Sequence, residues 1–263
     1  MTTEFINFNV QNGVAVIRLN RPEKFNSFVR EMALDLQERL DYCQTEKSIR
    51  AVVLTGNGKA FCAGQDLKEA TDDNGIELKN IVSEHYNPII LKIRKLNKPV
   101  IAAVNGVAAG AGANIALCCD LVIAGEAASF IQAFSKIGLI PDSGGTYFLP
   151  KLIGAQKASA LMMTGEKVNA REAEKINMIY KVVDDAELES TAINLAEKLA
   201  KMPTKALALT KQLLNESAEN TLEKQLQREY EEQWTAGRFK RITATPFCTL
   251  KLMNSVVIYI IAF

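Results

Sequence analysis

The feature that most constrains the fold of this chain is an alternation of short, almost wholly apolar runs with segments of helical periodicity. Residues 51–55 and 99–105 are apolar at nearly every position, which is typical of parallel strands buried on both faces. Before them, apolar residues recur at helical spacing to about Gln44, in a helix that Ser27 is expected to cap. The apolar face of this helix comprises Met32, Leu36, Leu40 and Cys43. The alternation predicts an α/β protein with a buried sheet.

The same pattern continues on both sides of these runs. An N-terminal hairpin is expected from strands at residues 4–10 and 14–19, with Asn12-Gly13 as the turn. We also expect a loop over 68–79, a helix ending near 96, a helix over 112–119 and a strand over 121–124. From Ser159 onward the chain reads as mostly helical. These predictions give an α/β core followed by a helical C-terminal region.

Composition and charge narrow the class of protein. The chain has 263 residues, of which 48% are hydrophobic, and its net charge of +1 argues against binding to nucleic acid through charge. No run reaches the ~18 apolar residues of a membrane span, and the first residues lack the pattern of a secretory signal. The five cysteines form no CxxC pair, which predicts reduced thiols and no metal site. We therefore expect a cytoplasmic protein without a membrane partner.

Two turns rich in small residues follow the two buried strands, at residues 59–67 and 105–114. Glycine and alanine let the backbone approach a ligand closely, and a helix behind the second turn would present free N–H groups at its positive end. Two such N–H groups directed at one oxygen would form an oxyanion hole. The same composition also suits tight packing of a helix on a strand, and both interpretations stay open at this point.

A third segment, residues 137–146, places the carboxylate of Asp142 between apolar residues and the pair Gly144-Gly145. Burial would raise the pKa of Asp142 and make it a better proton carrier near neutral pH. Alternatively, Asp142 caps a helix that begins near Gly144. The composition of the segment favours neither interpretation.

Several other site types fail on their own requirements. The run Gly110-Ala111-Gly112 begins a dinucleotide fingerprint, but Ile115 stands where the third glycine is needed. Ser143 is preceded two residues earlier by Pro141 and not by the glycine of a nucleophile elbow. The only histidine, His85, is expected on the surface or in packing, which argues against a Ser–His–Asp hydrolase.

Taken together and in this order, the motifs resemble the enoyl-CoA hydratase/isomerase (crotonase) superfamily. The segments that carry the resemblance are residues 20–27, 61–67, 98–106, 119–121, 138–145, 163–166 and 170–173. The resemblance spans about residues 4 to 238 and implies a crotonase-like spiral of ββα units with a helical C-terminal trimerisation region. It also implies an acyl-CoA thioester substrate, no separate cofactor, and a homotrimer or a dimer of trimers.

The resemblance further implies the roles of individual residues. Backbone N–H groups of Gln65 and Ala111 would form the oxyanion hole, and Asp142 would be the acid/base. The expected substrate- and CoA-binding residues are Ala63, Gly64, Asp66, Leu67, Lys68, Gly110, Asn114, Phe134 and Ile140. Of these, Phe134 and Ile140 are expected to exclude water from Asp142 and so raise its pKa.

The reaction type depends on where the carboxylates lie. Asn114 and Phe134 occupy the positions of the two glutamates that the family's hydratases use, so the resemblance implies isomerisation with Asp142 as the single acid/base. Residues 133–142 resemble family isomerases that convert a ring epoxide of phenylacetyl-CoA to an oxepin, and related members shift enoyl-CoA double bonds. The alternatives are an enoyl-CoA hydratase, or a non-catalytic member that binds acyl-CoA or RNA.

The predicted organisation has three parts. Residues 1–195 form the crotonase-like core, residues 196–240 form the helical C-terminal region, and residues 241–263 form an atypical apolar tail. The last stretch of the tail is uncharged with high β propensity, which is typical of aggregation-prone segments. We expect such a tail to affect activity and assembly.

Overall fold

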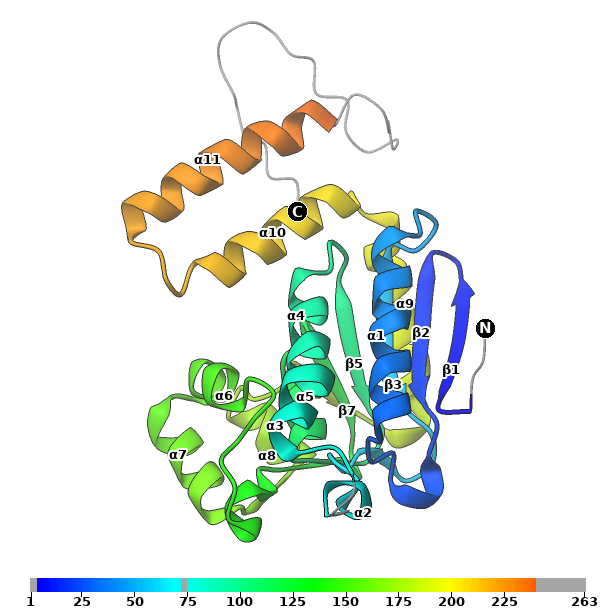
Figure 1. Ribbon diagram of the computed structural model, residues 1–263. Coiled ribbons are helices and arrows are strands. Elements are labelled where there is room, and N and C mark those ends of the chain that lie inside the picture. Colours follow the sequence, from blue (N-terminus) through cyan, green and yellow to red (C-terminus); the bar gives the residue numbers. More distant parts are fainter. Residues whose placement is uncertain (1–3, 72–74, 240–263) are drawn as a thin grey trace, which may run out of the picture.

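Two β-sheets organise the computed structural model, which describes residues 4–71 and 75–239 (Figure 1). The larger sheet has the strand order β1-β2-β3-β5-β7-β10 and the smaller sheet the order β4-β6-β8-β9. The larger sheet contains β1 (Ile6–Gln11), β2 (Val14–Leu19), β3 (Ala51–Gly56), β5 (Val100–Val104), β7 (Leu121–Gly125) and β10 (Lys181–Val183). The smaller sheet contains β4 (Ala60–Cys62), β6 (Val107–Ala109), β8 (Ser129–Ile131) and β9 (Lys167–Asn169).

The chain repeats one step from sheet to sheet. The strands β3, β5 and β7 each lead within a few residues into β4, β6 and β8 of the smaller sheet. Because β3, β5 and β7 pair in parallel, β4, β6 and β8 also become parallel neighbours. This repetition is the predicted spiral of ββα units, and it brings the segments that follow β4 and β6 together.

Helices cover the larger sheet on both faces. The helices that precede the C-terminal region are α1 (Arg30–Thr45), α2 (Leu67–Ala70), α3 (Leu78–Asn80), α4 (Asn87–Lys95), α5 (Ala111–Leu117), α6 (Gly145–Ile153), α7 (Ala155–Thr164) and α8 (Ala170–Lys175). A π-helical turn (Ile81–Tyr86) runs directly into α4. The apolar face predicted for α1 is buried against the sheet, as the spacing of its residues requires.

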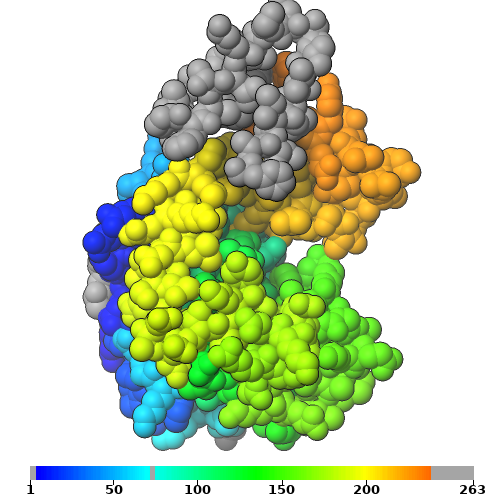
Figure 2. All heavy atoms as spheres, turned by 180° about the vertical axis from the view of Figure 1, so that it is seen from behind, coloured from blue at the N-terminus to red at the C-terminus, as the bar shows by residue number. Residues whose placement is uncertain are grey.

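The opposite face of the larger sheet is covered by α9 (Leu188–Lys201). Its Ala192, Ala196 and Ala200 pack on Val14 and Val53, because small residues every fourth position let the helix approach the strands closely. Figure 2 shows α9, in yellow, lying across this side of the molecule. The boundary placed at residue 195 in the sequence falls inside this helix.

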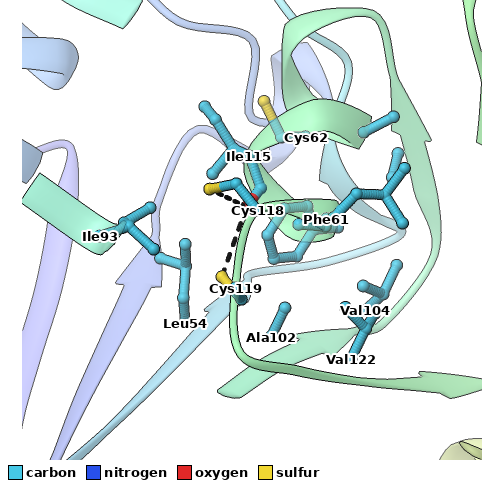
Figure 3. Packing of buried hydrophobic residues seen from close by; sticks show 14 of the residues in the cluster. Leu54, Phe61, Cys62, Ile93, Ala102, Val104, Ile115, Cys118, Cys119 and Val122 are labelled. Atoms are coloured by element: carbon cyan, nitrogen blue, oxygen red, sulfur yellow. Dashed lines mark hydrogen bonds between the residues drawn. The ribbon is translucent and has the colours of Figure 1, made fainter. Parts of the chain in front are cut away.

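The main core contains the thiols that the sequence predicted to be buried and reduced. Cys43, Cys62, Cys118 and Cys119 are all buried and free, whereas Cys248 lies outside the described residues. The thiols of Cys118 and Cys119 both donate to the carbonyl oxygen of Ile115, at 3.2 and 3.3 Å (Figure 3). These thiols are packing groups at the end of α5.

Three predicted boundaries were wrong. The helix α1 begins at Arg30 with Val29 at its N-cap and no side-chain cap, so Ser27 does not cap it. The predicted loop over 68–79 contains most of α2 and part of α3. Helical structure begins before the stretch from Ser159 that was predicted to be mostly helical, with a 3-10 turn at Ala133–Ile137 and α6 from Gly145.

The last two helices, α10 (Thr204–Glu216) and α11 (Leu222–Phe239), extend away from the sheets (Figures 1 and 2). The ammonium of Lys211 on α10 is buried and lies 2.8 Å from the Asp120 carboxylate, while it also donates to the carbonyl of Ile93. Arg94 of α4 bonds to both Asp120 and Asn215. Buried charge therefore fastens α10 to the core.

None of the helices in the described part of the chain combines the length and the apolar character of a membrane span. The predicted tail, residues 241–263, lies outside this part.

Candidate active site

The two glycine-bearing turns lie side by side because β4 and β6 are neighbouring parallel strands. Cys62 at the end of β4 pairs with Ala108 of β6. Gly64 adopts a φ of +90°, and a Cβ added to it would lie 3.0 Å from the Ala109 carbonyl oxygen and 3.5 Å from the Ala111 nitrogen. The close approach of the two backbones explains why this position carries glycine.

Each turn presents one backbone N–H group without an intramolecular acceptor. Ala111 is the first residue of α5, where helix geometry leaves the N–H unpaired, and Gln65 follows the left-handed Gly64. Among the hydrogen bonds of the described residues, neither the N–H of Gln65 nor that of Ala111 is a donor, whereas the neighbouring N–H of Asp66 bonds to Phe28 and that of Gly110 to Ile131. An oxyanion hole requires two free donors, and these two lie on adjacent turns.

The side chain of Gln65 is held on both sides. The hydroxyl of Tyr86 donates to Gln65 Oε1 at 2.8 Å, and Gln65 Nε2 donates to Glu69 at 2.5 Å. Tyr86 is 1% exposed, and burial, followed by the nearby Cys62 and Asp142, raises its pKa well above the usual value. The hydroxyl therefore stays protonated. Tyr86 was not predicted from the sequence, although a tyrosine in an apolar stretch usually has a bonding partner for its hydroxyl.

Asp142 lies in a tight turn that precedes α6. The N–H of Gly145 donates to the Asp142 carbonyl oxygen at 2.9 Å, and the residues between them, Ser143 and Gly144, have φ values of +52° and +74°. The Ser143 hydroxyl donates to Asp142 Oδ1 at 2.8 Å. Burial raises the pKa of Asp142, as a proton carrier near neutral pH requires. The capping alternative was wrong, because Gly144 is the N-cap of α6 and no side chain caps it.

Asn114 and Phe134 connect Asp142 with the glycine turn. Asn114, one turn into α5, is 1% exposed and donates from Nδ2 to the Asp142 carbonyl oxygen at 2.8 Å. Phe134 is 6% exposed, and its ring would lie 3.7 Å from a Cβ added to Gly110. The turn that carries Asp142 is therefore joined by a hydrogen bond to α5, the helix that begins at Ala111.

The remaining predicted residues lie farther from this centre. Ala63 is half-buried, and Asp66 pairs with Arg21 at 3.0 Å and caps α2 by accepting from the Lys68 N–H. Leu67 and Lys68 are exposed on α2. The sequence had predicted a loop that begins at Lys68, but this residue lies in the helix. One expectation was wrong in this single chain: Ile140 is 83% exposed, so its side chain does not shield Asp142.

Comparison with known proteins gives the class. Residues 9–240 match the family model described as Enoyl-CoA hydratase/isomerase. The chain belongs to this family, and its fold is the crotonase fold.

The chain is similar in sequence to proteins with different activities. It is 48% identical over 238 residues to the 1,2-epoxyphenylacetyl-CoA isomerase of Escherichia coli, an alignment that covers 89% of this chain and 91% of the relative. It is 40% identical to a probable enoyl-CoA hydratase of Rhodobacter capsulatus, covering 90% and 91% of the two chains. A crystal structure of a putative enoyl-CoA hydratase/isomerase from Mycobacterium abscessus superposes with a TM-score of 0.84 at 38% identity, covering 88% and 91%.

Proposed function

We propose that this protein is an acyl-CoA isomerase that acts through Asp142 as its single acid/base. The observation that carries the proposal is that the half-buried Asp142, whose pKa burial raises, is hydrogen-bonded through its backbone to Asn114 of α5, the helix whose first residue presents the unpaired N–H of Ala111. By resemblance to the family, Asn114 and Phe134 replace the two glutamates that activate water in hydratases. Neither side chain can act as a base, so one carboxylate remains to move one proton.

In the proposed mechanism, the thioester carbonyl oxygen accepts hydrogen bonds from the N–H groups of Gln65 and Ala111. Asp142 removes a proton from the carbon next to the carbonyl, and the electron pair moves into an enolate whose oxygen these donors stabilise. Asp142 then returns the proton to the far end of the allylic system, so atoms and charge balance and no water is added. Loss of one such donor costs about 3–4 kcal/mol of transition-state stabilisation. The reaction uses no cofactor beyond the CoA of the substrate.

We propose 1,2-epoxyphenylacetyl-CoA as the substrate, converted to its oxepin form, with double-bond shifts in enoyl-CoA as a second activity. The 48% identity to the E. coli isomerase supports this choice over the hydratases, which match at 40% identity and below. Ring expansion also preserves composition, so, like a double-bond shift, it needs no residue that activates water.

Product analysis from a 3-enoyl-CoA in heavy water tests the reaction type. Wild type should give a 2-enoyl-CoA that carries deuterium and has gained no water, and Asp142→Asn should lose this conversion while still binding the acyl-CoA. The ring epoxide is then tested with the same pair of proteins. A hydrated product, or near wild-type turnover by Asp142→Asn, contradicts the proposal.

We further propose that the protein assembles as a homotrimer or a dimer of trimers through its C-terminal helices. Apolar residues recur every fourth position on α11, and Leu222, Leu226, Tyr230 and Trp234 are each more than half exposed. Such a contiguous apolar surface is typical of an interface. Light scattering by the full chain should give three or six times the chain mass, and a monomer would contradict this assembly.

A further inference from the structure

We propose that Asn114 and Gln132 are positioning residues that hold the Asp142 turn in the conformation needed for proton transfer. The proposal rests on the proposed function of Asp142. It assigns a task to the position where the family's hydratases carry a glutamate: the amide of Asn114 takes no part in proton transfer and fixes the backbone that carries the base.

The contact between Asn114 and the turn is direct, and it joins a buried side chain to the half-buried Asp142. The Asp142 carbonyl oxygen accepts from Asn114 Nδ2 at 2.8 Å and from the Gly145 N–H at 2.9 Å, so both of its lone pairs are used. Asn114 is 1% exposed, and its own backbone lies within α5. A helix of the core thus anchors the first residue of the turn.

The turn needs such an anchor because its backbone is strained. Ser143 has a φ of +52° and is followed by Gly144 with a φ of +74°. Left-handed backbone is unfavourable for serine, and it persists where surrounding contacts over-determine the conformation. If the turn relaxed, the Asp142 carboxyl would change direction, because its Cα is the first of the turn.

Gly145 shows how closely the amide fits. A Cβ added at Gly145 would lie 2.5 Å from Asn114 Nδ2, 2.9 Å from Cγ and 3.0 Å from Oδ1. The whole amide group therefore lies flat against the start of α6, and only glycine leaves space for it. The Gly-Gly pair of the sequence serves two purposes, a left-handed φ at Gly144 and a close contact at Gly145.

Gln132 determines which way the Asn114 amide faces. Gln132 Nε2 donates to Asn114 Oδ1 at 2.8 Å, which leaves Asn114 Nδ2 as the atom directed at Asp142. Gln132 is 4% exposed, and its Oε1 has no hydrogen-bond partner among the described residues. A buried side-chain amide such as that of Gln132 is rarely left with an oxygen that has no partner. We attribute its presence here to the bond from Gln132 Nε2, which orients the Asn114 amide.

Three variants separate this role from a general loss of packing. Asn114→Ala removes the donor to Asp142. Gln132→Glu replaces the Nε2 donor by an oxygen, which favours the reversed Asn114 amide with its oxygen facing the Asp142 carbonyl. Gln132→Met removes the donor without forcing that reversal, so its effect should be smaller. Thr55→Val is the matched control, because it deletes one buried hydrogen bond, from Thr55 to Ala103, inside the larger sheet.

The first experiment measures steady-state deuterium incorporation into a 3-enoyl-CoA, with kcat and KM separated. A displacement of about 1 Å at a reacting group can cost roughly 100-fold in rate, so we expect a loss of that order in kcat for Asn114→Ala and Gln132→Glu, with KM nearly unchanged. In an Asp142→Glu background, which keeps a carboxyl but already displaces it, the same substitutions should cause little further loss, because positioning residues act through the group they position. Independent, multiplicative losses or an unchanged kcat would overturn the proposal.

A second readout does not depend on activity. Amide hydrogen exchange at Gly145, whose N–H bonds to Asp142, should accelerate in Asn114→Ala and stay as in wild type in Thr55→Val. If wild type fails to exchange protons of the substrate, the proposed function fails, and the Gly145 amide alone then decides the positioning role. Unchanged exchange at Gly145 in Asn114→Ala would overturn it whatever the activity.

Discussion

The proposed oxyanion hole leads to a specific prediction at Gly64. In Gly64→Ala, the new Cβ would lie 3.0 Å from the Ala109 carbonyl oxygen and 3.5 Å from the Ala111 nitrogen, while the backbone keeps a φ of +90°. The backbone of residues 109–111 must yield by a few tenths of an ångström, which moves the Ala111 N–H away from its position opposite Gln65. The methyl group also enters the space where the thioester oxygen would bind.

The expected cost has two parts that can be measured separately. The left-handed conformation costs an alanine about 1–2 kcal/mol of folding free energy. Loss of one oxyanion donor costs roughly 100- to 1,000-fold in kcat. Urea unfolding gives the first quantity, and kcat for isomerisation of a 3-enoyl-CoA gives the second.

Gly154→Ala is the matched control for this prediction. Gly154 has a φ of +79°, but a Cβ added there meets no atom within 4 Å. The control should lose stability and keep kcat. If Gly64→Ala also kept kcat while losing only stability, the assignment of the oxyanion hole to these two turns would be refuted.

Two further predictions concern charge. Because burial raises the pKa of Asp142, the folded protein binds this proton more tightly than the unfolded chain does, so the stability it contributes is lost as pH rises through the raised pKa. Asp142→Asn should therefore be more stable than wild type at pH 7 in urea unfolding, and this difference should shrink toward pH 3.8. The kcat of wild type should fall as the pH drops through the raised pKa of Asp142. Equal stabilities at pH 7 would contradict the argument that burial raises this pKa. Lys211→Ala leaves Arg94 as the ion-pair partner of Asp120 and should destabilise the protein by about 3 kcal/mol in the same assay, whereas a change under 1 kcal/mol would show that the pair does not fasten α10.

Much of the core could be predicted from local pattern. The apolar runs at β3 and β5 and the periodic face of α1 each carry enough signal within a few residues, because burial of one element leaves its mark on that element's own sequence. The start of α1 was less predictable. Ser27 is a good capping residue, but the chain first forms the turn at Pro22–Lys24, and Ser27 is buried by it before the helix begins.

Some residues of the candidate site could likewise be predicted from the local sequence, and others could not. The glycines and Asp142 could be identified from sequence because their neighbours are small or apolar residues in the same segment. Tyr86, Gln132 and the direction of the Asn114 amide could not, since each acts through a partner between 18 and 28 residues away in the chain. Exposure of Ile140 was likewise unpredictable, because an apolar residue beside an active carboxyl is buried only if another element covers it.

The class of fold, the two small-residue turns and the candidate carboxylate of Asp142 follow from residue type and short spacing, so they can be found in the chain before it is folded. That the two turns meet follows from the folded structure, because parallel pairing of β4 with β6 is a contact between residues more than 40 positions apart. The folded structure also decided that Asn114 faces Asp142 and that Tyr86 holds Gln65. Hydrogen bonds of this kind are directional and non-local, so they exist only once the sheets have set the positions of both partners.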